Sequence, residues 1–336
     1  GTQLLQAPQT KPLPEPTATL DFADIKGQET AKRAMEIAAA GGHNILMIGP
    51  PGSGKSMLAS RLPSIMPPMT MKEILDISNI HSVAGLLKDG QLVSTRPFRD
   101  PHHSASTPAL VGGGLRARPR EISLAHGGIL FLDELPEFAR TTLEALRQPL
   151  ETGKVSVARA NVHITYPARF QLVAAMNPCR CGYVGVRGHE CSRAPRCAEE
   201  YQAKISGPLL DRIDLHIDVP AVAPWELGQG GGESSAVIRA RVQQAISFAA
   251  PRFKDLPFHK NAEADGAVLE QIVHMEPTAK TLLINAAEKL MLSARGYHRI
   301  MRVARTIADL GQSETVREIH VAEALSFRKP LRRKDT

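Results

Sequence analysis

The feature that most constrains the fold is a glycine-rich loop between an apolar segment and a helix-like segment. Residues 45–48 read ILMI, residues 49–56 read GPPGSGKS, and residues 57–62 read MLASRL. A strand that runs through G-x-x-x-x-G-K-S into a helix is a phosphate-binding loop, because the glycines let backbone N–H groups and the helix N-terminus face an anion. The pattern predicts a doubly wound parallel α/β fold that binds a nucleotide. The residues expected to line it are Gly49, Pro50, Pro51, Gly52, Ser53, Gly54, Lys55, Ser56 and Met57.

A second motif predicts what happens to the nucleotide. Residues 129–134 read ILFLDE, an apolar strand that ends in two carboxylates. Asp133 is expected to join Ser56 around Mg²⁺, while Lys55 reaches the β- and γ-phosphates. Glu134 is expected to orient and deprotonate the water that attacks the γ-phosphate. The alternative is the first turn of a helix, where acidic residues are favoured in any case. Beside the phosphate-binding loop, the pair indicates ATP hydrolysis with Mg²⁺ as cofactor.

Composition limits the remaining classes. The chain has 336 residues, a net charge of +7 and only 4% aromatic residues. This length predicts two domains, the basic charge permits nucleic-acid binding, and the few aromatics argue against recognition by base stacking. No apolar run approaches the roughly 20 residues of a membrane span, and the polar, proline-rich start is unlike a secretory signal. We therefore expect no membrane association and a cytoplasmic location.

The chain divides by composition into several parts. These are a proline-rich linker (1–20), a core of alternating strands and helices (21–222), a Gly- and Pro-rich linker (223–235), and a helical lid domain with a basic tail (236–336). The clearest strands are 44–48, 129–132 and 171–175, and their alternation with helices favours a parallel sheet. Residues 78–115 interrupt that rhythm and are expected to be an insertion.

Polar residues outside the two motifs complete a predicted ATPase site. Asn177 ends an apolar strand and is expected to position the attacking water; the alternative is a plain turn residue. Arg212 is expected to act as an arginine finger on a neighbouring subunit, or else to pair with a nearby Asp. Arg295, Arg299 and Arg302 share one helix face, so one of them is expected to reach back to ATP across the domain junction. The alternative for that face is simple solvation.

All four cysteines lie within 19 residues. They are Cys179, Cys181, Cys191 and Cys197. Because a cytoplasmic protein does not normally keep disulfides, the cluster predicts a structural tetrahedral Zn²⁺ site. The spacing is not that of common zinc ribbons, so free or partly oxidised thiols remain the alternative.

In residues 154–164, apolar and polar side chains alternate on both sides of a short polar tip, and this pattern predicts a β-hairpin. Lys154 and Arg159 are its cationic residues. An ordinary surface hairpin is the alternative to a functional one.

Taken together, these segments resemble the AAA+ ATPases, and within them the magnesium-chelatase-like branch, over residues 21–327. Several segments are similar to one subgroup of hexameric competence helicases, which drive DNA branch migration during natural transformation. Those segments are 24–28 (DIKGQ), 99–103 (RDPHH), 110–114 (LVGGG), 129–138 (ILFLDELPEF) and 206–214 (SGPLLDRID).

The resemblance implies specific roles. Ile25 and Gly27 would lie near the adenine. Asn177 would be sensor 1, Arg212 the finger acting in trans, and Arg299 sensor 2, with Arg302 in reserve. Residues 78–115 would contain the family's helix-2 insert. The hairpin would point into the pore of a hexamer, where Lys154 and Arg159 would meet the DNA backbone.

The resemblance also implies that a Lon-protease-like domain precedes this region in related proteins and is absent here. The leading interpretation is an ATP-driven DNA translocase. A magnesium-chelatase-type motor for metal insertion, or a nucleotide switch that does no mechanical work, is the alternative.

Overall fold

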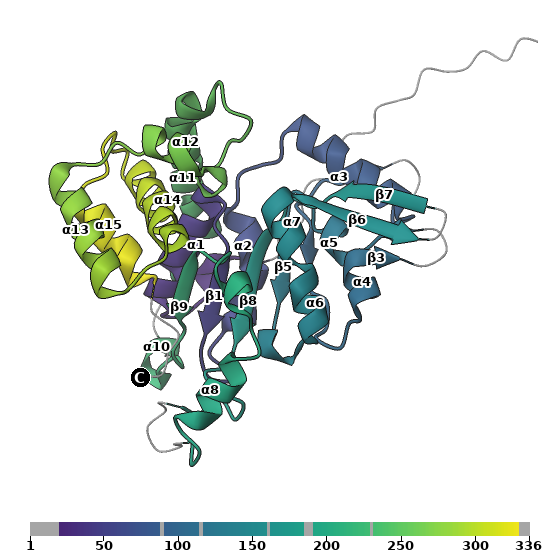
Figure 1. Cartoon of the computed structure of the whole chain (residues 1–336), viewed down its shortest axis with the longest axis horizontal. Coiled ribbons are helices and arrows are strands. Elements are labelled where there is room, and N and C mark those ends of the chain that lie inside the picture. The colour runs from purple at the N-terminus through teal and green to yellow at the C-terminus, as the bar shows by residue number, and fades with distance from the viewer. Residues whose placement is uncertain are drawn as a thin grey trace, which may run out of the picture.

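A computed structural model describes residues 20–87, 91–113, 117–159, 162–184, 191–228 and 231–328. Its centre is a five-stranded parallel sheet in the order β2-β5-β8-β1-β9 (Figure 1). The strands are β1 (Ile45–Ile48), β2 (Phe98–Arg99), β5 (Ile129–Leu132), β8 (Gln171–Met176) and β9 (Leu215–Asp218). The predicted α/β fold is confirmed.

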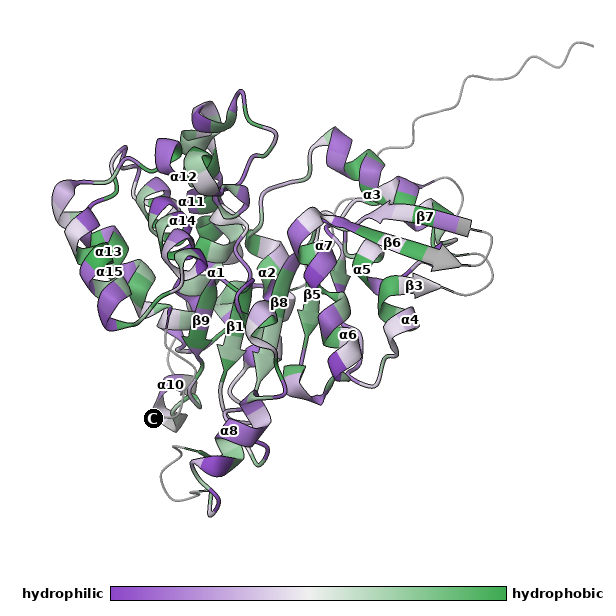
Figure 2. Ribbon diagram, viewed as in Figure 1, coloured by the Kyte–Doolittle hydropathy of each residue, from purple (hydrophilic) through white to green (hydrophobic). Residues whose placement is uncertain are grey.

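The sheet contributes side chains to two apolar cores, because successive side chains of a strand point to opposite faces. In β1, Ile45 and Met47 belong to the larger core and Leu46 to the smaller one. Covered faces on both sides explain why β1 and β5 are continuous apolar runs and why β8 is apolar after Gln171; Figure 2 shows these strands mainly in green.

Helices at the two ends of the chain share the larger core. Here α1 (Glu29–Gly41) and α2 (Lys55–Ile65) pack with α11 (Ser235–Ala249), and α1 and α11 also pack with α14 (Ala294–Leu310). Figure 1 shows the C-terminal helices gathered on the β9 side of the sheet. The other helices there are α12 (Gly266–Ile272), α13 (Pro277–Lys289) and α15 (Glu318–Ser326), with the short turns η3 (Ala250–Phe253) and η4 (Asn261–Glu263). None of the described helices combines the length and apolar character that a bilayer crossing requires.

Residues 78–115 are not wholly an insertion. Phe98 and Arg99 form β2, which pairs with β5 as the fifth strand of the central sheet. A two-residue strand is too short to show an alternating pattern, so the sequence did not reveal it. Around it lie α3 (Met71–Val83), α4 (Thr107–Val111), α5 (Glu121–Leu124) and the small ribbon of β3 (Gly112–Gly113) and β4 (Arg118–Pro119).

The hairpin is present and is longer than expected. It consists of β6 (Lys154–Arg159) and β7 (Val162–Pro167), which are antiparallel, and residues 160–161 lie outside the described part. Lys154 pairs with Pro167 at the base of the hairpin, whereas Arg159 pairs with Val162 at the last pair of the ladder. The two predicted DNA-binding residues therefore sit at opposite ends of β6.

Short elements complete the described chain. They are η1 (Phe22–Asp24), η2 (Leu135–Glu137), α6 (Arg140–Ala145), α7 (Arg147–Thr152), α8 (Arg196–Gln202), α9 (Gly207–Leu210) and α10 (Pro224–Leu227). Of the predicted basic tail at 328–334, only Arg328 is described.

Candidate ATP site and its surroundings

The phosphate-binding loop leaves β1 and enters α2. A Cβ on Gly49 would lie 2.0 Å from the carbonyl oxygen of Val219 and 2.8 Å from Ser53 Oγ, so only glycine lets the loop start this close to the end of β9. Gly52 and Gly54 have φ of +74° and +90°, and a Cβ on either would meet nothing within 4 Å. The loop thus presents an open, left-handed backbone, which suits the approach of a phosphate chain.

Lys55 lies inside this loop and is 7% exposed. Its Nζ donates to the carbonyl oxygens of Gly49 and Pro50 at 2.8 Å and to Asn177 Oδ1 at 3.3 Å. Burial lowers the pKa of Lys55, against the opposing effect of the Asp133 and Glu134 carboxylates. Asn177 follows β8, the direct neighbour of β1, so the parallel pairing brings the amide to the lysine.

The residues present fit a magnesium ion. Ser56 Oγ donates to Asp133 Oδ2 at 2.7 Å, which joins the first residues of α2 to the end of β5. Hydroxyl and carboxylate oxygens are the hard ligands that Mg²⁺ takes beside phosphate oxygens. Asp100, after β2, adds a carboxyl whose pKa is raised by burial and by the charge of Asp133. Sequence reasoning missed Asp100, since β2 itself was missed.

Glu134 adopts a left-handed backbone, with φ of +52°. Such a conformation is uncommon for a residue with a Cβ and is concentrated at functional sites. Its carboxylate Oε2 lies 3.1 Å from His103 Nδ1, and the His103 ring is 4.1 Å from that of His102. His103 therefore fixes the direction of the candidate base. No local signal identified this role, because the contact depends on β2 pairing with β5.

The segment before α1 closes one side of the loop. Ile25 is buried and Gly27 has a φ of +59°. Gln28 Nε2 donates to the carbonyl oxygens of Ser53 at 3.3 Å and Pro220 at 2.5 Å. Ile25 and Gly27 are thus held near the loop, and their predicted contact with adenine remains a prediction. Gln28 is a further positioning residue that sequence reasoning did not select.

Arg212 lies at the opposite end of the sheet from the loop. Its carbonyl oxygen accepts a bond from Asn44, just before β1, and its guanidinium pairs with Glu151 Oε2 at 2.6 Å and donates to Pro208 O at 2.7 Å. The alternative expectation was an ion pair between Arg212 and an Asp. The ion pair observed is with Glu151, a residue of α7. Arg212 is well separated from Lys55 of its own chain.

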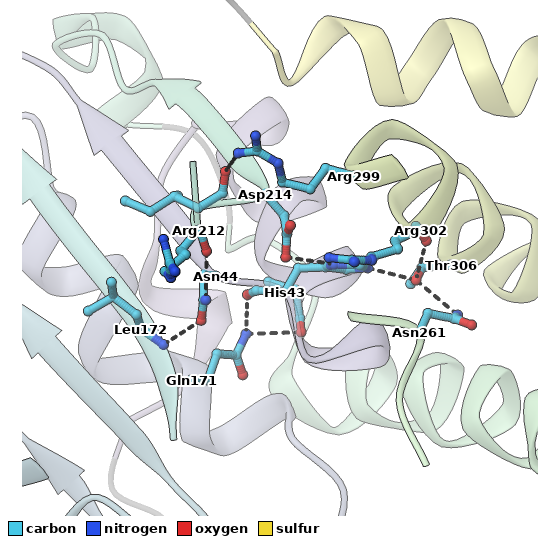
Figure 3. Close-up of polar contacts among 12 residues, drawn as sticks. His43, Asn44, Gln171, Leu172, Arg212, Asp214, Asn261, Arg299, Arg302 and Thr306 are labelled. Atoms are coloured by element: carbon cyan, nitrogen blue, oxygen red, sulfur yellow. Dashed lines mark hydrogen bonds and ion pairs between the residues drawn. The ribbon is translucent and has the colours of Figure 1, made fainter. Parts of the chain in front are cut away.

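Arg299 and Arg302 lie at the same amino-terminal end of the strands (Figure 3). Arg299 is 2% exposed, pairs with Asp211 Oδ1 at 3.0 Å and donates to the Ile213 carbonyl at 3.4 Å. Arg302 pairs with Asp265 Oδ1 at 2.9 Å. These contacts place Arg299 and Arg302 away from Lys55 of their own chain, because α14 docks beside the start of β9. The expectation that one of the three arginines of this helix face reaches ATP stays a prediction. A sensor role toward another subunit remains a prediction.

A buried polar network joins α14 to the sheet. His43 is fully buried, with Nδ1 3.2 Å from Asp214 Oδ2 and Nε2 2.8 Å from Thr306 Oγ1, and Asn261 also donates to Thr306 at 3.0 Å (Figure 3). Burial would raise the pKa of Asp214, but the His43 bond and the charges of Arg302 and Arg299 outweigh it and lower that pKa. The network fixes the segment that carries Arg212 relative to the C-terminal helices.

The four cysteines come together after β8. Their four sulfur atoms all lie within 4.8 Å of one another, and the Cys179 and Cys181 sulfurs are 3.2 Å apart. Cys179 and Cys197 are buried, whereas Cys181 is exposed. In a tetrahedral Zn–thiolate site with Zn–S of 2.3 Å, sulfurs are about 3.8 Å apart. The arrangement is therefore compatible with zinc.

Comparison with known proteins agrees with this geometry. A family model for magnesium chelatase subunit ChlI matches residues 21–227, and one for the C-terminal part of that subunit matches residues 232–328. Competence protein ComM of Haemophilus influenzae is 47% identical over 317 residues, which cover 94% of this chain and 61% of ComM. An uncharacterized protein of Salmonella typhimurium, YifB, is 45% identical over 330 residues, covering 98% of this chain and 64% of YifB.

A more distant match is DNA replication licensing factor mcm7 of Xenopus tropicalis, 27% identical over 191 residues that cover 57% of this chain and 22% of mcm7. The chain spans less than two thirds of the length of ComM and YifB. With its phosphate-binding loop, its carboxylate pair and its parallel sheet, the chain belongs to the magnesium chelatase subunit ChlI family of AAA+ ATPases.

Proposed function

We propose that this chain is the ATP-hydrolysing part of a hexameric ring motor that moves along DNA, and that it serves branch migration in transformation or recombination. The observation that carries the ATPase part is the convergence of Lys55, Ser56, Asp133 and Asn177, with Glu134 beside them. Such a motor works where ATP and DNA are both present, so we also propose a cytoplasmic location.

The residues divide the chemistry among them. Lys55 and the loop amides bind the phosphates. Ser56 and Asp133 would hold Mg²⁺, which would supply positive charge to the phosphate oxygens. Glu134 takes the proton of the attacking water, and Asn177 orients that water. His103 holds the Glu134 carboxylate, which is half exposed, in the direction from which it accepts that proton.

Arg212 completes the site of a neighbouring subunit. In a ring with head-to-tail contacts, one surface of each subunit meets a different surface of the next. We propose that here the amino ends of the sheet meet the phosphate-binding loop of the neighbour. Arg212 would then supply positive charge to the γ-phosphate from outside. Arg299, which is buried and paired with Asp211, would hold the segment that carries Arg212.

Two observations support DNA as the partner. The hairpin β6–β7 lies on the opposite side of the molecule from the C-terminal helices, as Figure 1 shows, and Arg159 is the last residue of β6. The relatives include a competence protein and a replication licensing factor. The backbone of Arg159 lies about 17 Å farther along β6 than that of Lys154, at roughly 3.4 Å per residue, so we propose Arg159 as the residue nearer the pore.

The deciding experiment measures ATP hydrolysis with no DNA, with linear duplex and with forked or branched DNA, and follows assembly by size-exclusion chromatography. We expect branched DNA to stimulate hydrolysis and to promote rings. Glu134→Gln is the control, since it should bind ATP and assemble without turnover. A rate that no DNA changes would argue against translocation.

A magnesium-chelatase-type motor is the second candidate, because the matching family model bears that subunit's name. It predicts stimulation by a chelatase partner subunit and none by DNA. A nucleotide switch, the third candidate, predicts slow turnover that neither partner stimulates. The same assay therefore separates all three.

We also propose that Cys179, Cys181, Cys191 and Cys197 bind one structural Zn²⁺. Four thiolates leave no open position for a water, which argues against a catalytic role for the metal. Elemental analysis of protein purified without added metal should give about one zinc per chain. Absence of zinc, together with four thiols that react freely, would refute this assignment.

A further inference from the structure

Among the described residues around it, the cysteine cluster has almost no apolar core of its own. Its buried members are Cys179, Cys197 and Ala198, with Val184 and Cys191 partly buried against them, and the group is separate from the two large cores. So small a cluster cannot hold a fixed shape by burial alone, and a bound metal is the usual substitute for a missing core. Its geometry would then depend on the metal.

A turn from this cluster packs directly on the phosphate-binding loop. Gly182 N donates to the Cys179 carbonyl at 3.0 Å, and Gly182 has a φ of +85°. A Cβ on Gly182 would lie 2.5 Å from Pro51 Cδ and 2.8 Å from Pro51 Cγ, with Asn177 Cγ at 3.9 Å. The backbone of Gly182 therefore touches the loop at a place where no other residue fits.

The cluster also holds Asn177 from its other side. Asn177 is two residues before Cys179, and its Oδ1 accepts from Lys55 Nζ at 3.3 Å. The intervening Pro178 carbonyl accepts from Gln202 Nε2 at 3.0 Å, and Gln202 belongs to α8, the helix that carries Cys197. The turn after Cys181 thus contacts the phosphate-binding loop, and the helix that carries Cys197 is bonded to the residue after Asn177.

We propose that zinc in the cysteine cluster braces the ATP site: by fixing the turn at Gly182 against Pro51 and Asn177, it holds the loop in its ATP-binding form. The brace rests on the proposed ATP-binding and zinc-binding roles and adds a link between them. The four cysteines act as positioning residues, since none of them touches the nucleotide position.

The test measures zinc content and the Kd for a fluorescent ATP analogue in the same preparations. Gly182→Ala keeps all four cysteines but forces the turn off Pro51, so it should retain zinc and bind the analogue about five- to a hundredfold more weakly. Cys181→Ser removes an exposed ligand and should lose zinc and affinity together. Gly207→Ala is the matched control, because a Cβ there meets nothing within 4 Å.

The outcomes distinguish the ATP-binding role, the zinc-binding role and the proposed link between them. An unchanged Kd in Gly182→Ala, or in a zinc-free but folded Cys181→Ser, would overturn the brace while leaving the ATP site intact. Tight binding by a parent protein that holds no zinc would do the same. A parent protein that does not bind the analogue at all would instead refute the proposed function. If circular dichroism shows that Cys181→Ser is unfolded, the parent protein stripped of zinc by a chelator replaces it, and an unchanged Kd in that folded, zinc-free protein would overturn the brace.

Discussion

Arg212→Ala is expected to abolish hydrolysis by acting on the neighbouring subunit. Asn44, which bonds to Arg212, and Gly49, which opens the phosphate loop, are five residues apart along β1. At roughly 3.3 Å per residue, the strand separates them by about 16 Å. An arginine side chain does not span that distance, so Arg212 cannot serve the ATP of its own chain. The variant should therefore bind ATP with the parental Kd.

The size of the effect can be worked out. Loss of an arginine finger lowers the rate by about 10³-fold or more where it has been measured. Mixing Arg212→Ala with Lys55→Ala subunits regenerates a complete site wherever an intact Arg212 faces an intact Lys55. For random head-to-tail rings at equal amounts this holds at about a quarter of the interfaces, and the fraction falls toward zero at either extreme.

The assay is steady-state ATP hydrolysis across a series of mixing ratios at constant total protein. Glu151→Ala is the matched control, since it removes the ion partner of Arg212 and leaves the finger in place. We expect a symmetric curve that peaks at the equal mixture, while each variant alone is inactive. Mixtures without activity at any ratio would refute the action in trans, because residues that serve the same chain cannot complement each other.

Three further predictions follow from the described contacts. Glu134→Gln should bind ATP normally and hydrolyse it at well under a hundredth of the parental rate, about the value of a lost general base, in a single-turnover assay; near-parental turnover would remove Glu134 from catalysis. Arg159→Ala should lower the slope of log DNA affinity against log salt concentration by about 0.7–0.9 and leave basal hydrolysis intact. Lys154→Ala, at the hairpin base, should lower that slope less, and a larger effect of Lys154→Ala would place the DNA path elsewhere. Burial, with the charges of Arg328 and Arg299, lowers the pKa of His216 to about 4. As pH falls below about 6.5, the unfolded chain therefore takes up a proton that the folded chain does not, and the free energy of unfolding should drop by about 2 kcal/mol between pH 7 and pH 5. Urea unfolding should show this drop in the parent protein and not in His216→Leu, and equal drops in both would contradict the prediction.

The sequence by itself determined the phosphate chemistry. The loop at 49–56, the carboxylates at 133–134 and the amide at 177 each end an apolar strand, and parallel strands bring their carboxyl ends to one edge. Local pattern and one topological rule therefore sufficed to place Lys55, Ser56 and Asp133 together. The apolar stripe of α14 was equally readable, because helical spacing is local.

Only the tertiary structure decided which end of the sheet each arginine occupies. Arg299 lies with Asp211 because α14 docks on α1 and α11, and no spacing within α14 encodes that docking. The contacts of His103 with Glu134 and of Gly182 with Pro51 likewise join residues brought close by strand order and by turns outside any motif. Sequence periodicity records which face of an element is buried, but not which partner covers it, so these contacts required the assembled fold.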